Sequence, residues 1–147
     1  MKVRKKGFTL LELLMVIMVI AILIGIALPR FRGMVEEGNV VKAKGELRTL
    51  QIAVENYYMH HTNAYPTAIT GTTLTGDTPQ IVSVLPTDPF NGASNYGYAQ
   101  GGSKYYVIYS VGPANCTNAT IDASTGNVTE TGGNCIYVSN GQQDTSP

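Results

Sequence analysis

The stretch FTLLELLMVIMVIAILIGIAL, from Phe8 to Leu28, decides the fold of this 147-residue chain. It contains one charged residue, Glu12. At 1.5 Å of rise per residue, a helix of this length measures about 30 Å, which is the thickness of the hydrocarbon core of a bilayer. Lipid offers the backbone no hydrogen-bond partners, so a single segment at that depth must be helical. The stretch therefore predicts a membrane-spanning helix.

The residues on either side of this stretch indicate how it is used. Four basic residues precede it, namely Lys2, Arg4, Lys5 and Lys6. The excess of positive charge on cytoplasmic segments predicts that this end stays in the cytoplasm and that the remainder is exported. A secretory signal peptide would have a shorter apolar core and a small-residue cleavage site, whereas this apolar stretch continues into LPRFRGM. We therefore expect no ordinary signal-peptidase cleavage.

The segment KKGFTLLELLMVIMVIAILIGIALP, residues 5–29, resembles the N-terminus of type IV prepilins and of type II secretion pseudopilins. The shared features are a short basic leader, Gly7, Phe8, and Glu12 inside an apolar helix. The resemblance implies that a prepilin peptidase cuts between Gly7 and Phe8 and methylates the new amine of Phe8. The implied regions are a cleaved leader at 1–7, a transmembrane and assembly helix at 8–28, and an exported helix continuation with a globular head at 29–147.

Glu12 is the feature that a plain membrane anchor would lack. A carboxylate in a spanning helix costs up to about 3 kcal/mol, less near the interface, and marks a functional candidate that needs a partner. After cleavage, the cation available to it is the amine of Phe8, either in the same chain or in a neighbouring copy. The resemblance favours the amine of a neighbouring copy, where the pair would set the stagger of helices in a filament. The alternative is that Glu12 only reaches up to the lipid headgroups.

Beyond the apolar stretch, Gly25 and Pro29 predict a kink or a local loosening, because proline removes a helix hydrogen bond and clashes with the preceding turn. The helix is expected to resume and to end between residues 59 and 62, ahead of Pro66. One apolar stripe runs along it at spacings of three and four residues. The stripe comprises Val40, Ala43, Leu47, Leu50, Val54 and Tyr57.

His60 and His61 close this predicted helix. Adjacent side chains on a helix point about 100° apart, and no nearby Cys or Asp completes a metal-binding set. We therefore expect the two histidines to cap the negative end of the helix rather than to bind a metal. No cofactor is expected.

The following region predicts a small antiparallel sheet. Residues 66–95 are expected to form a loop with one helical turn, and strands are expected at residues 96–99 and 105–111, joined by a turn at residues 100–103. The segments YPT, LPTDPFNG and YYVIYSVG resemble those of the major pseudopilin of type II secretion, in the same order. The two resemblances together cover most of residues 1–112.

The last third departs from that family. The resemblance would imply an acidic calcium-binding loop after the YSVG segment, but Asp122 and Glu130 are the only carboxylates in residues 113–135. Because calcium prefers several carboxylate oxygens, no calcium site is carried over. Cys116 and Cys135 are the only cysteines and lie on the exported, oxidising side, so they predict a disulfide across a terminal loop. Such a loop looks more like type IV pilins.

Charge and composition narrow the function further. Four of the ten basic residues lie in the leader, which leaves six against ten acidic residues in the processed chain. Beyond the leader, no basic run with interleaved aromatic residues is present, so no nucleic-acid partner is expected. Three sequons, at Asn115, Asn118 and Asn127, are permissible glycosylation sites.

The sequence thus predicts an α+β filament subunit and not an enzyme. The resemblance places it in the bacterial inner membrane with a periplasmic head, and favours a type II secretion pseudopilus over a type IV pilus. A membrane-anchored enzyme or binding module is the remaining alternative. The implied partners are copies of itself and other pilins or pseudopilins, the prepilin peptidase, an inner-membrane assembly platform and membrane lipid.

Overall fold

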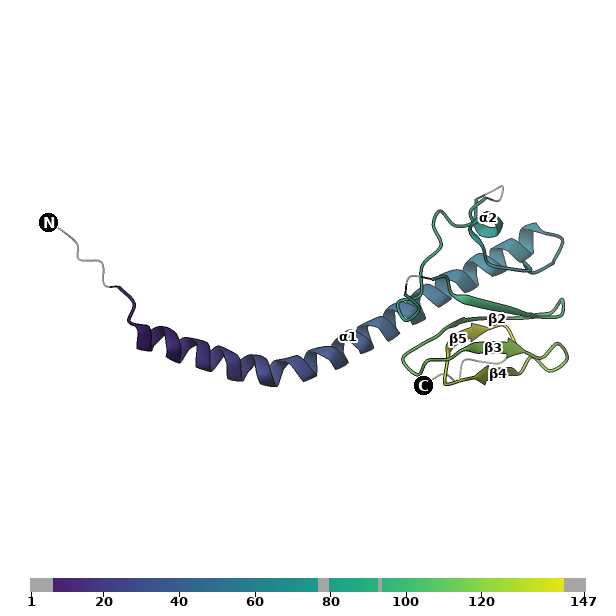
Figure 1. Cartoon of the computed structure of the whole chain (residues 1–147). Helices are drawn as coiled ribbons and strands as arrows, with labels where there is room; N and C mark the ends of the chain where they lie inside the picture. Colours follow the sequence, from purple (N-terminus) through teal and green to yellow (C-terminus); the bar gives the residue numbers. More distant parts are fainter. Residues whose placement is uncertain (1–6, 77–79, 93, 142–147) are drawn as a thin grey trace. The chain divides into compact units, whose positions relative to one another are not determined.

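The structure is a computed structural model that describes residues 7–76, 80–92 and 94–141 (Figure 1). The basic residues of the leader lie outside this described part. The chain divides into two compact units, residues 1–37 and 38–147, and each is described by itself.

The long helix α1 runs from Leu10 to His60 and contains Pro29. Its helical backbone continues through Gly25 and Pro29 without interruption, so the helix does not end there. A bend of its axis at these two residues stays a prediction. The end of the helix at His60 confirms the expected boundary.

The second half of α1 buries the stripe that the sequence predicts. Four of the six stripe residues are almost fully buried, and Val40 and Tyr57 at its ends are partly buried against the same core. Ala53 joins them on the buried face. The fold prediction of a helix packed on a sheet is therefore confirmed in the second unit.

The sheet that covers this stripe has three antiparallel strands in the order β1-β2-β5, with β1 at Gly97–Gly101, β2 at Tyr105–Ser110 and β5 at Ile136–Ser139. The predicted hairpin of β1 and β2 is present, with Gly101 opposite Tyr105. Its turn falls at residues 102–104 rather than 100–103, because β1 starts and ends later than expected. A short helix, α2 at Gly71–Leu74, supplies the expected helical turn.

The last third is not the loop that the sequence led us to expect. It contains β3 at Asn118–Ile121, β4 at Val128–Thr131, and β5. Strands β3 and β4 pair antiparallel in a separate hairpin, and β3 alternates exposed and buried residues, with Ala119 and Ile121 inside. Two apolar residues give little period-two signal, although β-branched Thr and Val favour such strands.

The head therefore has three layers (Figure 1). One core lies between α1 and the inner face of the three-stranded sheet, where Tyr106 and Ile108 of β2 and Ile136 and Val138 of β5 face the helix. The second core lies between the outer face of that sheet and the β3–β4 hairpin, and Val107 of β2 points into it. Strand β2 thus contributes alternate side chains to both cores.

One glycine of β1 is required by its neighbour across the sheet. Gly97 lies opposite Tyr109, and a Cβ atom at Gly97 would fall inside the Tyr109 ring. The ring therefore occupies the space above the glycine, and the Tyr109 hydroxyl donates to Asn118 Oδ1 of β3 at 2.9 Å. This packing connects the three-stranded sheet to the β3–β4 hairpin.

Candidate functional site

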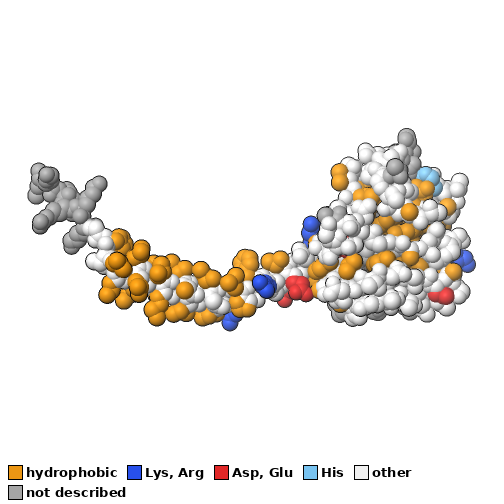
Figure 2. Space-filling model, in the orientation of Figure 1, with side chains coloured by type: hydrophobic (Ala, Val, Ile, Leu, Met, Phe, Trp, Pro, Cys, Tyr) orange, Lys and Arg blue, Asp and Glu red, His pale blue; other side chains and the backbone are white. Residues whose placement is uncertain are grey.

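The first candidate site is the apolar surface of α1 in the first unit. Among the described residues, α1 is the one helix long and apolar enough to cross a membrane, and none of its most apolar window is buried within the chain. Figure 2 shows that apolar side chains cover the face of this helix that is visible in the view. A bare apolar surface of this kind needs lipid or another protein as its surroundings.

Glu12 lies in the first turn of this helix, next to a capping residue that the sequence analysis missed. Thr9 directly precedes the helix, and the backbone N–H of Glu12 donates to Thr9 Oγ1 at 3.2 Å. The spacing of Thr9 and Glu12 is that of a capping box, which was visible in the sequence as T-L-L-E. The Glu12 carboxylate is thus placed at the positive end of the helix dipole.

Gly7 and Phe8 lie outside the helix and are exposed, with 78 % of the Phe8 side chain accessible. The chain described here is unprocessed, so the Phe8 nitrogen is a peptide nitrogen and becomes an amine only after cleavage. Phe8 and Glu12 lie about one helical turn apart along the sequence. Their pairing between copies stays a prediction.

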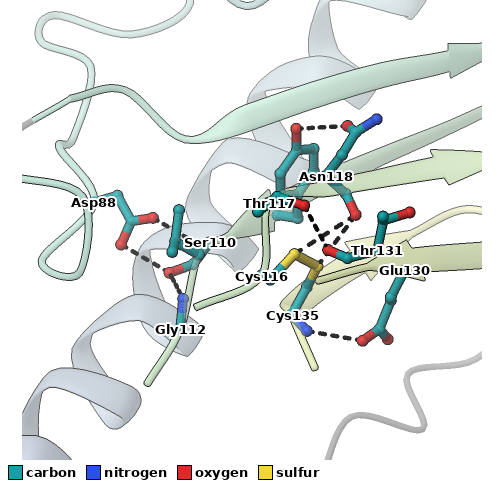
Figure 3. The surroundings of a disulfide bond; sticks show 11 residues. Asp88, Ser110, Gly112, Cys116, Thr117, Asn118, Glu130, Thr131 and Cys135 are labelled. Atoms are coloured by element: carbon teal, nitrogen blue, oxygen red, sulfur yellow. Dashed lines mark hydrogen bonds between the residues drawn. A yellow bond between two sulfur atoms is a disulfide. The ribbon is translucent and has the colours of Figure 1, made fainter. Parts of the chain in front are cut away.

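A second arrangement, also missed from the sequence, holds the head together at the end of β2. Asp88 is 1 % exposed, and its Oδ1 atom accepts hydrogen bonds from Phe90 N at 2.9 Å and Ser110 Oγ at 2.7 Å, while Oδ2 accepts from Val111 N at 2.9 Å. Gly112 N then donates to Ser110 Oγ at 3.2 Å, and the backbone of Gly112 has a positive φ of 62° (Figure 3). We call these residues the Asp88 clamp.

The Asp88 clamp joins the two sequence segments that carried the second resemblance. Asp88 belongs to LPTDPFNG, and Ser110 and Gly112 belong to YYVIYSVG. One carboxylate therefore fixes the loop before β1 to the end of β2. The sequence signal that could have found it is the presence of both segments in one chain, with a single acidic residue, Asp88, in the first and a serine, Ser110, in the second.

Cys116 and Cys135 form the predicted disulfide (Figure 3). Both are about 1 % exposed and belong to the second core. Cys116 lies just before β3 and Cys135 just before β5, so the bond ties the hairpin to the three-stranded sheet. Cys135 N also donates to Glu130 Oε2 of β4 at 2.8 Å.

The two carboxylates of residues 113–135 have structural partners. Asp122 Oδ1 accepts hydrogen bonds from the backbone N–H and hydroxyl groups of Ser124 and Thr125 in the turn between β3 and β4, at 2.7 to 2.9 Å. These bonds hold the pKa of the exposed Asp122 carboxyl below its ordinary value of 3.8. In the described ranges, no cluster of three or more His, Cys, Asp or Glu residues has the geometry of a metal site.

The histidines at the end of α1 contact the carbonyl groups of its last turn. His60 Nδ1 lies 2.9 Å from Asn56 O, and His61 Nδ1 lies 3.1 Å from Tyr57 O. The expectation that they cap the helix is therefore confirmed. The His61 ring also stacks on Tyr57, with ring centroids 3.8 Å apart.

Tyrosine hydroxyls link the sheet to α1 through carboxylates of the helix. Tyr106 OH donates to Glu55 Oε1 at 2.7 Å, and Tyr96 OH donates to Glu46 Oε2 at 2.6 Å. Burial, reinforced by the neighbouring carboxylate, raises the pKa of both phenols far above the ordinary 10.0. Burial also raises the pKa of Tyr98, whose hydroxyl donates to Pro66 O at 2.7 Å.

Comparison with known proteins agrees with this geometry. Residues 2–28 match the family model described as the prokaryotic N-terminal methylation motif. The chain is 27 % identical to the type II secretion system core protein G of Pseudomonas aeruginosa over 122 residues, which is 74 % of this chain and 84 % of the relative. The chain is therefore similar to the type IV pilin-like proteins, in its N-terminal motif and over most of its length.

The chain is also similar to further secretion and pilus proteins. It is 28 % identical to the type II secretion system core protein G of Escherichia coli K12 over 125 residues, covering 75 % of this chain and 83 % of the relative. It is 41 % identical to the type IV major alpha-pilin of Moraxella bovis over 51 residues, covering 35 % and 32 %. No solved structure matches it significantly.

Proposed function

We propose that this chain is a structural subunit of a type IV-like filament, the pseudopilus of a type II protein secretion system. The observation that carries the proposal is the joining of two features in one chain. A methylation motif lies on a bare apolar helix, and a head similar to core protein G follows it. No catalytic role is proposed.

The physical basis of assembly is an exchange of apolar surroundings. The apolar residues of the first unit are stable in lipid or against the same surface of other copies, and both environments remove them from water. Moving a subunit from the membrane into a bundle therefore changes the hydrophobic free energy little. Growth and retraction of such a filament are reversible for that reason.

Processing prepares the subunit for this step. In the proposed pathway, a prepilin peptidase cuts between Gly7 and Phe8 at the cytoplasmic face and methylates the Phe8 amine. An inner-membrane assembly platform then moves the subunit into the filament, while its head lies in the periplasm. The exposed, non-helical backbone at Gly7 and Phe8 supports access by a peptidase, because proteases bind extended segments.

Glu12 is proposed to pair with the Phe8 amine of a neighbouring copy. Within a bundle of apolar helices, an unpaired carboxylate costs free energy, so the register that supplies a cation is favoured. The capping contact with Thr9 fixes the residue at which the helix starts. It therefore also fixes the position of Glu12 along the helix axis, in the first turn.

The substitution Glu12→Ala tests this proposal. We expect normal membrane insertion and loss of sheared filaments, measured by fractionation and electron microscopy of cells that carry the secretion machinery. Leu14→Ala is the matched control, because it shortens a neighbouring exposed side chain without removing charge, and it should still assemble. Filaments of normal abundance from Glu12→Ala would refute the role of this carboxylate.

A type IV pilus is the second candidate, favoured by the similarity to the Moraxella bovis alpha-pilin over 51 residues. Deletion of the gene separates the two candidates. Loss of exoprotein secretion with surface pili intact supports the pseudopilus, whereas loss of surface pili with secretion intact supports the pilus.

A further inference from the structure

The segment from Arg30 to Glu37, just beyond the membrane-spanning stretch, combines charged side chains with exposed apolar ones. It carries four charges in eight residues, namely Arg30, Arg32, Glu36 and Glu37. A charged side chain within the hydrocarbon core costs about 2.5 kcal/mol or more, so this segment lies outside that core. Figure 2 shows side chains of both charges at the end of the apolar helix surface.

The same segment exposes large apolar side chains. Phe31 is 65 % exposed, Met34 60 % and Val35 52 %. Exposed apolar groups that are contiguous with one another indicate a surface that binds another protein. Protein–protein interfaces are enriched in aromatic residues, methionine and arginine, and this segment contains all three.

None of the four charged side chains forms an ion pair within the part of the chain that the structure describes. All four are exposed. Arg32 and Glu36 are four residues apart on α1, and the structure describes no ion pair between them, whereas Lys42 Nζ lies 3.8 Å from Glu46 Oε1 at the same spacing. The charges of the Arg30–Glu37 segment are thus available to another molecule.

We propose that this segment is an inter-subunit contact in which Arg30 and Arg32 of one copy pair with Glu36 and Glu37 of a second copy. The inference rests on the proposed filament function. The basic pair precedes the acidic pair along the helix, so two parallel copies at equal height place like charges side by side. A relative displacement along the axis places opposite charges together.

The displacement follows from helix geometry. Arg30 and Glu36 differ in height by about 9 Å, and Arg32 and Glu37 by about 7.5 Å, at 1.5 Å per residue. A neighbour displaced by about 8 Å therefore satisfies both pairs at once, within the reach of these long side chains. Such a contact uses different faces of the two copies, which is the geometry that produces open helical filaments.

The direction of this displacement agrees with that of the proposed Glu12 contact. Pairing Glu12 of one copy with the Phe8 amine of the next requires a shift of about 6 Å in the same sense. In both contacts, the acidic residue has a higher residue number than the cationic one. The copy that supplies the cation is therefore displaced toward the C-terminal end of its neighbour's helix in both cases. Two charge contacts at opposite ends of the apolar stretch thus favour one stagger.

The test compares three variants of the full chain in cells with the assembly machinery. Each of R30E/R32E and E36R/E37R brings like charges together, which opposes association strongly. We expect each to reduce filament yield by about tenfold or more. The combined variant R30E/R32E/E36R/E37R restores opposite charges at the same positions and keeps the net charge, so its yield should return to near the unmodified level.

Lys104→Glu is the control, because it changes the net charge in the head, in the turn between β1 and β2. Insertion and head orientation are measured for every variant by protease accessibility. Failure of the combined variant to assemble, or normal assembly of either two-residue variant, would overturn the contact alone. Absence of filaments from the unmodified chain would overturn the proposed function as well.

Discussion

Replacing the buried carboxylate of the Asp88 clamp by its amide should destabilise the head. In Asp88→Asn, one oxygen still accepts from Phe90 N and Ser110 Oγ, but the new NH₂ group faces the N–H of Val111, where Oδ2 accepts at 2.9 Å. The substitution therefore leaves the partly buried Val111 N–H without an acceptor and brings two hydrogen-bond donors face to face. Leaving a buried polar group unsatisfied costs about 1–3 kcal/mol, so we expect a loss of about 2 kcal/mol.

Asp88→Ala removes the acceptor of all three donors, and we expect a loss of about 3–5 kcal/mol. That is a large fraction of the roughly 5–15 kcal/mol by which such domains are stable. For a unit of this size, 1 kcal/mol shifts Tm by about 4–8 °C, so Asp88→Asn should lower Tm by about 10 °C. Unfolding of the full chain in detergent, by urea and by heat, is measured. The probe is the near-ultraviolet circular dichroism of its tyrosines.

Asp122→Asn is the matched control. Asp122 also accepts several hydrogen bonds, but its carboxylate is fully exposed, and water replaces any partner that the substitution removes. Its effect should be much smaller than that of Asp88→Asn. Equal effects of the two substitutions, or an unchanged stability of Asp88→Asn, would refute the argument from burial.

Two further predictions concern the head. Replacing both Cys116 and Cys135 by Ser should lower the free energy of unfolding by about 3 kcal/mol, as expected for a closed loop of about 20 residues, and a thiol count of two in the untreated protein would contradict the bond. Burial raises the phenol pKa values of Tyr96, Tyr98 and Tyr106 above the ordinary value of 10.0. The stability that these neutral phenols contribute is therefore fully present below pH 10 and is lost as the pH rises above 10. Phenolate absorbance from these three should therefore appear together with unfolding, and phenolate formation in a chain that stays folded would show the burial argument to be wrong.

The sequence predicted the elements whose residues repeat with a clear period. The apolar stretch after Gly7 and the stripe from Val40 to Tyr57 define α1, and the run of apolar and aromatic residues in β2 defines the hairpin. These segments carry many apolar side chains at regular spacing, so burial overrides any local ambiguity.

The last third could not be predicted in the same way. Strands β3 and β4 have four residues each, and β4 is Val-Thr-Glu-Thr, with no fully buried residue. Their position depends on the disulfide and on packing against β1 and β2, which are contacts between residues distant in the sequence. Composition rich in Thr, Asn and Gly indicates a loop when such contacts are unknown.

The candidate site shows the same division. Gly7, Phe8 and Glu12 were identified from a motif, whereas Thr9 was overlooked although its spacing to Glu12 was legible in the sequence. The Asp88 clamp required the fold, because Asp88 and Ser110 are separated by 22 residues and meet only when the loop before β1 folds against the end of β2.

The position of β5 has a consequence for the making of this protein. Strand β5 is the last strand in the described chain, yet it pairs with the central strand β2 and contributes Ile136 and Val138 to the packing against α1. A copy whose translation stops before residue 136 leaves one side of β2 unpaired and part of α1 bare, which invites aggregation and proteolysis. We therefore expect truncation before residue 136 to reduce the yield of folded head, even though the membrane-spanning stretch is intact.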